Sequence, residues 1–99
     1  MYAMNGGFLA RPGKRDELVS ILLLAANVVS EMDDCRMYVV NEDVSDPNRV
    51  VVFEVWEDKA AHDASLQDER VMALISNARP LIDGITNSAE LSVKGGHGV

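Results

Sequence analysis

The segment at residues 49–56 constrains the fold most, because six of its eight side chains are apolar. Its valines, Phe53 and Trp56 favour a β-strand. A strand with one face in water alternates apolar and polar residues, whereas this one is apolar on both sides. We therefore expect helices of the same chain on one face of its sheet. A second copy of the sheet should cover the other face, which predicts a homodimer.

The remaining elements are predicted from periodicity and from turn residues. A stripe of apolar side chains recurs every three or four residues between 14 and 32, as in an amphipathic helix. Gly6 and Gly7 lie inside the first strand and suggest a bulge or a close approach of another segment. Asp83 and Gly84 are predicted to form a turn. We expect strands at 2–10, 35–44, 49–56 and 85–93, and helices at 14–32, 59–66 and 68–78.

This order of elements, β-α-β-β-α-β, is that of ferredoxin-like folds. We therefore predict the α+β class, with a four-stranded antiparallel sheet and helices on one face. A chain of 99 residues has room for one domain, which we place at residues 1–94. The glycine-rich residues 95–99 are expected to be a flexible tail.

Charge and cysteine content narrow the functional classes. The net charge is −7 and the basic residues form no stripe, so nucleic-acid binding is not expected. No apolar run is long enough for a membrane span, and the N-terminus has no signal-peptide pattern. The single cysteine, Cys35, cannot form an intrachain disulfide, which favours a reducing cytoplasm.

Two stretches resemble the antibiotic biosynthesis monooxygenase (ABM) family, which includes quinol monooxygenases. The first is Phe-Leu-Ala-Arg-Pro-Gly-Lys-Arg-Asp-Glu-Leu at 8–18, and the second is Val-Phe-Glu-Val-Trp-Glu-Asp-Lys-Ala-Ala-His at 52–62. Their order and spacing extend the resemblance over nearly the whole chain. The resemblance implies a dimeric α+β barrel with a pocket between sheet and helices in each subunit. It also implies oxidation of a small aromatic quinol or anthrone by O₂, without a metal or another cofactor.

The sequence departs from the family pattern on the helix after the tryptophan. Ser65 and Arg70 stand where many members carry histidines. Asp33-Asp34 replaces a Pro-Gly turn before Cys35. Haem degradation, which the family's close relatives perform, is therefore the weakest of three predicted functions. The leading one is cofactor-independent monooxygenation, and its rival is a non-catalytic dimeric protein that binds a small molecule.

Five residues are candidates for the site. Two catalytic candidates follow from the resemblance. Trp56 corresponds to a residue that commonly faces the pocket in the family, and Asn5 lies near the place of a first-strand asparagine in relatives. His62 is the third catalytic candidate, as a general base, because histidine side chains titrate near neutral pH. Tyr38 could donate to a phenolate and Arg79 could stabilise an anionic intermediate, so both are predicted to bind substrate. Each of these residues also has an alternative placement without a functional role. Trp56 could lie in the core or at an interface, and Tyr38 could be half-buried in the sheet. His62, Asn5 and Arg79 could be surface residues.

Glu54 is the unusual acid, because it lies inside an apolar strand. It is either buried and paired or placed on an exposed row of the strand. A paired structural role, with a partner such as Arg49 across the dimer, is the expected one. No cluster of histidine, cysteine and acidic residues has the spacing of a metal site, so no metal is predicted.

Overall fold

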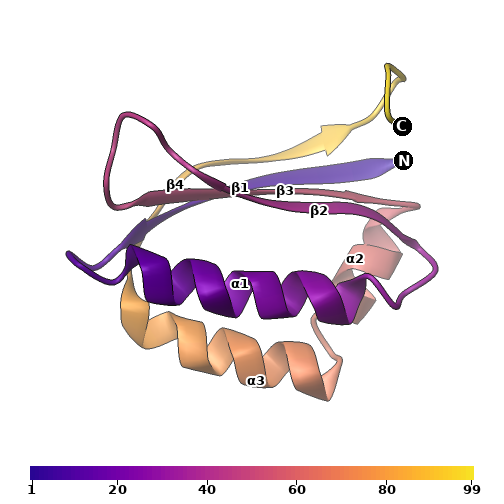
Figure 1. Cartoon of the computed structure of the whole chain (residues 1–99). Coiled ribbons are helices and arrows are strands. Elements are labelled where there is room, and N and C mark those ends of the chain that lie inside the picture. The colour runs from indigo at the N-terminus through magenta and orange to yellow at the C-terminus, as the bar shows by residue number, and fades with distance from the viewer.

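One face of a four-stranded sheet carries all the helices, and the other face is open (Figure 1). The computed structural model describes residues 1–99. It confirms the predicted α+β class and the ferredoxin-like order of elements. The elements are β1 (Tyr2–Ala10), α1 (Arg15–Val29), β2 (Cys35–Glu42), β3 (Arg49–Trp56), α2 (Lys59–Ser65), α3 (Glu69–Ala78), the 3₁₀ helix η1 (Arg79–Leu81) and β4 (Ile82–Ser92).

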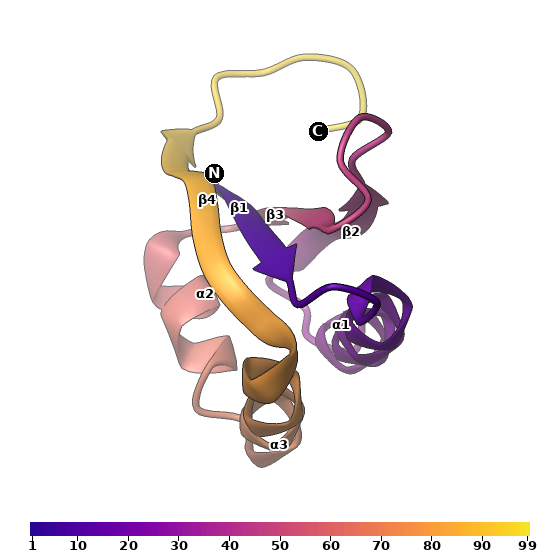
Figure 2. The same cartoon turned by 90° about the vertical axis from the view of Figure 1, so that its left-hand side faces the viewer.

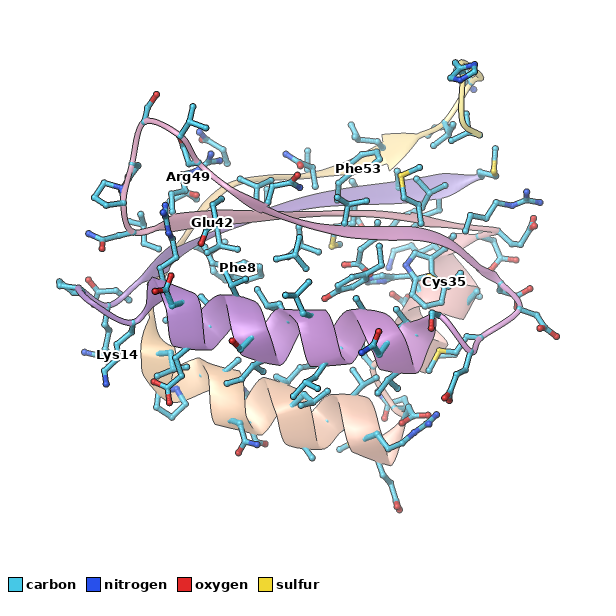
Figure 3. The ribbon with its side chains drawn as sticks, in the orientation of Figure 1. Phe8, Lys14, Cys35, Glu42, Arg49 and Phe53 are labelled. Carbon is cyan, nitrogen blue, oxygen red and sulfur yellow. The ribbon has the colours of Figure 1, made fainter.

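The strands lie in the order β2-β3-β1-β4, and every neighbouring pair is antiparallel. Successive side chains of a strand point to opposite faces, so the register decides which residues meet the helices. Phe8 of β1 lies opposite Val50 of β3, and both pack in the core beneath the sheet. Figure 3 shows Phe8 pointing toward α1 and Phe53 pointing away from the helices. The even-numbered residues of β1 and β3 therefore form the helix face.

Helix α1 forms because its apolar residues recur at helical spacing along one side. Leu18, Ala25 and Val29 are its buried residues. Leu18 packs with Val50 in one cluster, whereas Val29 packs with Trp56 in a second cluster nearer the other end of the sheet. The helix is shorter than predicted, because the polar residues after Val29 form turns instead of a further helical turn.

Two short helices follow β3, and each begins at an aspartate. Asp58 caps α2 by accepting a hydrogen bond from the backbone N–H of Ala61, as aspartates at this position commonly do. Asp68 caps α3 in the same way, by accepting from Arg70 and Val71. Helix α3 runs beside α1 under the sheet, and α2 lies near the end of β3 (Figure 1).

The prediction of a turn at Asp83 and Gly84 is wrong. Both residues belong to β4, where Gly84 pairs with Leu9 of β1. The chain reverses earlier, through η1, because Pro80 lacks the N–H that would continue α3.

The expectation for the glycine pair in β1 is confirmed at Gly7. A Cβ built on Gly7 would lie 2.4 Å from the backbone oxygen of Thr86, so β4 approaches too closely for any side chain. The register between β1 and β4 shifts at this point, with one extra residue in β4. Asn87 stands in that bulge with a φ of 30°.

Helices leave the opposite face of the sheet uncovered. Partly exposed apolar side chains lie on this open face, among them Leu9, Val39 and Phe53. In Figure 2 the last residues leave β4 and turn back toward β2, so that Val99 lies near Arg36. No helix combines the length and the hydropathy that a membrane crossing would need.

Candidate active site

A cavity lies between the helix face of the sheet and helices α1 and α3. Ten of its twelve lining residues are hydrophobic. Such a lining suits an apolar ligand that is oriented by a few polar groups. The polar groups come from β2, β3 and α2. The residues around the cavity are Ile21, Leu22, Ala25, Val29, Tyr38, Glu54, Ser65, Leu66, Val71, Leu74, Ile75 and Ala78.

Glu54 is the acid in this wall. It faces the helices because it lies two residues before Trp56 on β3, and the side chain is 15% exposed. Its Oε1 accepts a hydrogen bond from Nε1 of Trp56 at 3.0 Å. Burial raises the pKa of Glu54, although the bond from Trp56 and the nearby His62 act in the opposite direction. A carboxyl with a raised pKa binds protons more readily, which suits acid–base chemistry near neutral pH.

His62 lies behind Glu54, on the side of α2 that packs against the sheet. Its Nε2 is 3.9 Å from Oε1 of Glu54, and its Nδ1 is 3.0 Å from Oδ1 of Asp63. The ring packs edge-on against Trp56, with centroids 6.0 Å apart, and at a tilt against Tyr2. The side chain is only 7% exposed. The expectation that His62 is solvated is therefore wrong, because α2 packs against the sheet and places this side chain against the rings of Tyr2 and Trp56.

Tyr38 extends from β2 into the cavity wall, directly opposite Glu54 in the sheet register. Its hydroxyl makes no hydrogen bond within the chain, so it is free to donate to a ligand. Burial raises the pKa of Tyr38, and the neighbouring Glu54 raises it further. The phenol therefore stays protonated at neutral pH and can serve as a hydrogen-bond donor.

The predicted site residues do not all come together. Trp56 and His62 stand behind Glu54 and do not line the cavity, whereas Tyr38 does. Asn5 pairs with Phe53 in the register, so it lies on the open face of the sheet, away from the other four. Arg79 is exposed at the start of η1 and does not line the cavity either.

Glu54 is buried and paired, which is one of the two placements expected from the sequence, but its partner is not the expected one. Its partners are Trp56 and His62, and the expected pairing with Arg49 does not fit this geometry. Arg49 is odd-numbered on the same strand and contacts Asp43 and Thr86 instead. The alternation of a strand contained the signal, because residues two apart share a face.

Ser65, which departs from the family pattern, is buried in the cavity wall. Its hydroxyl donates to the backbone oxygen of His62 at 2.6 Å. No sequence signal indicates this role, since it depends on how α2 packs. No group of three or more His, Cys, Asp and Glu side chains is arranged to hold a metal ion.

Together these groups can move a proton to or from an apolar ligand. The carboxyl of Glu54 can take a proton, the hydroxyl of Tyr38 can donate to an anion, and the apolar helices can exclude water. The ferredoxin-like fold and this site together define a class of small α+β proteins that have an apolar cavity between sheet and helices, with an acid–base group in its wall.

Comparison with known proteins identifies the family within that class. The sequence matches the antibiotic biosynthesis monooxygenase family over residues 1–75, so the chain belongs to this family. No curated protein matches it. A solved structure from Chloroflexus aurantiacus that bears the family's name is 38% identical, with 97% of this chain and 95% of that chain covered and a TM-score of 0.89.

More distant structures share the fold. One from Deinococcus radiodurans, also named for the family, is 22% identical, covers 97% of this chain and 95% of its own, and has a TM-score of 0.84. One from Nitrosomonas europaea is 9% identical, with 96% and 100% covered and a TM-score of 0.88. At these identities the likeness concerns the fold alone.

Proposed function

We propose that this protein is a monooxygenase that oxidises an electron-rich aromatic substrate, of the anthrone or quinol type, with O₂ and without a further cofactor. The observation that carries the proposal is the buried carboxyl of Glu54, which lies in the wall of an apolar cavity and is held by Trp56 beside His62. Membership of the antibiotic biosynthesis monooxygenase family supports the same reaction class.

The substrate would lie between the sheet and helices α1 and α3. Side chains such as Leu22 and Ile75 would contact its rings, and the hydroxyl of Tyr38 would donate to its oxygen. That donor becomes more valuable when the oxygen gains negative charge, so it favours the anion over the neutral substrate.

Reaction would begin with proton transfer from the substrate to the carboxylate of Glu54. For an anthrone, the acidic carbon loses its proton and the charge spreads onto the carbonyl oxygen near Tyr38. Desolvation strengthens Glu54 as a base, because burial favours its protonated form. Apolar walls also protect the reactive anion from water.

Oxygen would then react with this anion. One electron passes from the anion to O₂, and the resulting radical pair combines to form a carbon–oxygen bond. The peroxide takes up a proton. The oxygen–oxygen bond breaks as the remaining hydrogen on that carbon leaves as a proton, so one oxygen atom stays in the quinone and the other leaves as water. The overall equation is one anthrone and one O₂ to one anthraquinone and one water.

We further propose that the protein is a homodimer whose subunits meet through the open faces of their sheets. The support is the apolar character of that face, where Val39 is 41% exposed and Leu91 is 43% exposed. Sedimentation should give about twice the chain mass of 10.8 kDa, and a species of that single mass would contradict the dimer.

A second candidate is a non-catalytic protein that binds a small apolar molecule. The observation that favours it is the almost wholly hydrophobic cavity, in which Ser65 stands where the family pattern has a histidine. Such a protein would bind anthrones and quinols, with a change in the fluorescence of Trp56, but would consume no oxygen.

Oxygen uptake with a panel of anthrones and quinols distinguishes the two functions. We expect uptake with at least one compound, with one O₂ consumed for each anthrone converted to its quinone. Binding without uptake across the panel would favour the binding protein. Catalase should leave the rate and stoichiometry unchanged, because the proposed reaction releases water and no hydrogen peroxide.

A further inference from the structure

Three side chains on two elements form a line from the cavity to the solvent. Glu54 of β3 lines the cavity and is 15% exposed, while the side chain of Asp63 on α2 is 52% exposed. His62 lies between them and is nearly buried, with one ring nitrogen facing each carboxyl. The imidazole is thus the one group that contacts both the cavity's acid and a solvated carboxylate.

The contact with Asp63 determines which ring nitrogen carries the hydrogen. An ionised carboxylate can only accept, so the nitrogen 3.0 Å away, Nδ1, must be the donor. Lys59 and then His62 hold the pKa of Asp63 below its usual range, which keeps this carboxylate ionised. In the neutral ring Nε2 is then without hydrogen, and it faces Oε1 of Glu54 at 3.9 Å.

The ring is held in this orientation from several elements. Trp56 of β3 packs edge-on against the imidazole, and Tyr2 of β1 packs against it at a tilt. The hydroxyl of Tyr2 donates a hydrogen bond to Glu90 of β4. Lys59 of α2 forms ion pairs with both Asp63 and Glu90. The charged or titratable groups around His62 are therefore Glu54, Asp63, Tyr2, Lys59 and Glu90. Of the carboxyls among them, Glu54 and Asp63 contact a ring nitrogen.

We propose that Glu54 exchanges its proton with solvent through His62, and that Asp63 is the positioning residue that holds the imidazole in the required tautomer. This inference rests on the proposed function, since it concerns the same carboxyl. It goes further by giving that carboxyl a path to water that remains open when a substrate fills the cavity.

The proton balance closes over one reaction cycle. Outward, the side chains of Glu54 and His62 first close from 3.9 Å to hydrogen-bond distance. The proton on Oε1 of Glu54 then passes to Nε2, while the proton on Nδ1 passes to Asp63 and on to water. The ring is left with its hydrogen on Nε2. Inward, Nε2 returns a proton to Glu54, for delivery to the peroxide, and Nδ1 regains one from the Asp63 side. Each cycle of anthrone oxidation uses both directions once, so the starting tautomer is restored without rotation of the ring.

Nitrogen-15 NMR of the His62 ring tests the positioning role without any turnover. At alkaline pH, where the ring is neutral, we expect the hydrogen on Nδ1 in the wild-type protein. Asp63→Ala removes the acceptor on the exposed side of α2, so the hydrogen should move to Nε2. Glu69→Ala, a matched loss of an exposed acid on α3, should leave the tautomer unchanged. A wild-type ring with its hydrogen on Nε2, or a tautomer that Asp63→Ala does not alter, would overturn the proposal.

Kinetics test the relay separately from the proposed reaction. In the oxygen-uptake assay, Asp63→Ala should lower kcat about tenfold or more while KM stays unchanged, because Asp63 does not line the cavity. An unchanged kcat together with a changed tautomer would contradict the relay but leave the monooxygenase proposal intact. If the wild-type protein consumes no oxygen, the proposed function fails, whereas the NMR result still decides the positioning role.

Discussion

Nε1 of Trp56 donates a hydrogen bond to Oε1 of Glu54, two residues earlier on the same strand and 3.0 Å away. This contact follows from the period of a β-strand, which places both side chains on the helix face. It joins the largest buried side chain of the core to the acid of the cavity wall. The indole thereby fixes the carboxyl's orientation and supplies part of its electrostatic environment.

Trp56→Phe should raise the pKa of Glu54 further. The hydrogen bond from Trp56 stabilises the ionised carboxylate, and the substitution removes that bond. Carbon-13 NMR of the labelled Glu54 carboxyl measures this directly. Asn5→Ala, on the open face of the neighbouring strand, should leave the pKa unchanged. A pKa that falls or stays constant in Trp56→Phe would show that the indole does not act on the carboxyl in this way.

Glu54→Gln should stabilise the protein at neutral pH and have a smaller effect in acid. The ordinary pKa of the carboxyl is 4.5, and burial raises it in the folded state, so the folded protein holds this proton after the unfolded chain has released it. The free energy of unfolding therefore falls as pH rises through that window, and the loss is complete above the folded-state pKa. Glutamine does not ionise and still accepts from Trp56.

Urea denaturation from about pH 4 to pH 8 checks this expectation. The difference in unfolding free energy between Glu54→Gln and the wild type should grow with pH. If that difference were constant, or shrank toward neutral pH, the account of a carboxyl with a raised pKa would be wrong.

Tyr38→Phe removes the one free hydroxyl in the cavity wall and changes little else in the packing. We expect kcat/KM for an anthrone to decrease by about tenfold, in line with about 1.4 kcal/mol for a hydrogen bond to a developing charge. Tyr2→Phe is a suitable control, because its hydroxyl contacts Glu90 at the surface. Equal effects of the two substitutions would argue against a donor role for Tyr38.

Gly7→Ala should destabilise the fold by about 1–3 kcal/mol, because the new methyl group would displace the backbone of β4 at Thr86. Gly6→Ala is the matched control. Its Cβ would meet the ring of Phe8 at 3.7 Å, an ordinary contact, and the change in stability should be much smaller. Thermal melting of the two variants measures the difference, and similar melting temperatures would contradict the tight approach at Gly7.

The sequence predicted those features that depend on local pattern. The strand at residues 49–56 has the bounds expected from its β-branched run. The turn expected at Asp83-Gly84 is absent because pairing with β1 overrides the local turn preference of these residues. Long-range pairing of this kind has no signature within a short window of sequence.

Much of the site depends on packing that a single sequence does not show. His62 has charged neighbours on its own helix, yet Tyr2 and Trp56 enclose it once α2 docks against the sheet. The face that Glu54 shares with Trp56 could have been deduced from strand alternation. By the same rule, Asn5 could have been placed opposite Phe53, on the face away from the cavity, once the register between β1 and β3 was known.

Oxygen uptake by Glu54→Gln tests the central claim most directly. Glutamine keeps the shape of the side chain and the bond from Trp56 but cannot take a proton from the substrate. We predict that the wild-type protein oxidises an anthrone, and that the variant binds it with similar affinity but reacts at least about 100-fold more slowly. Oxidation by Glu54→Gln at the wild-type rate would contradict the role of Glu54 as the base.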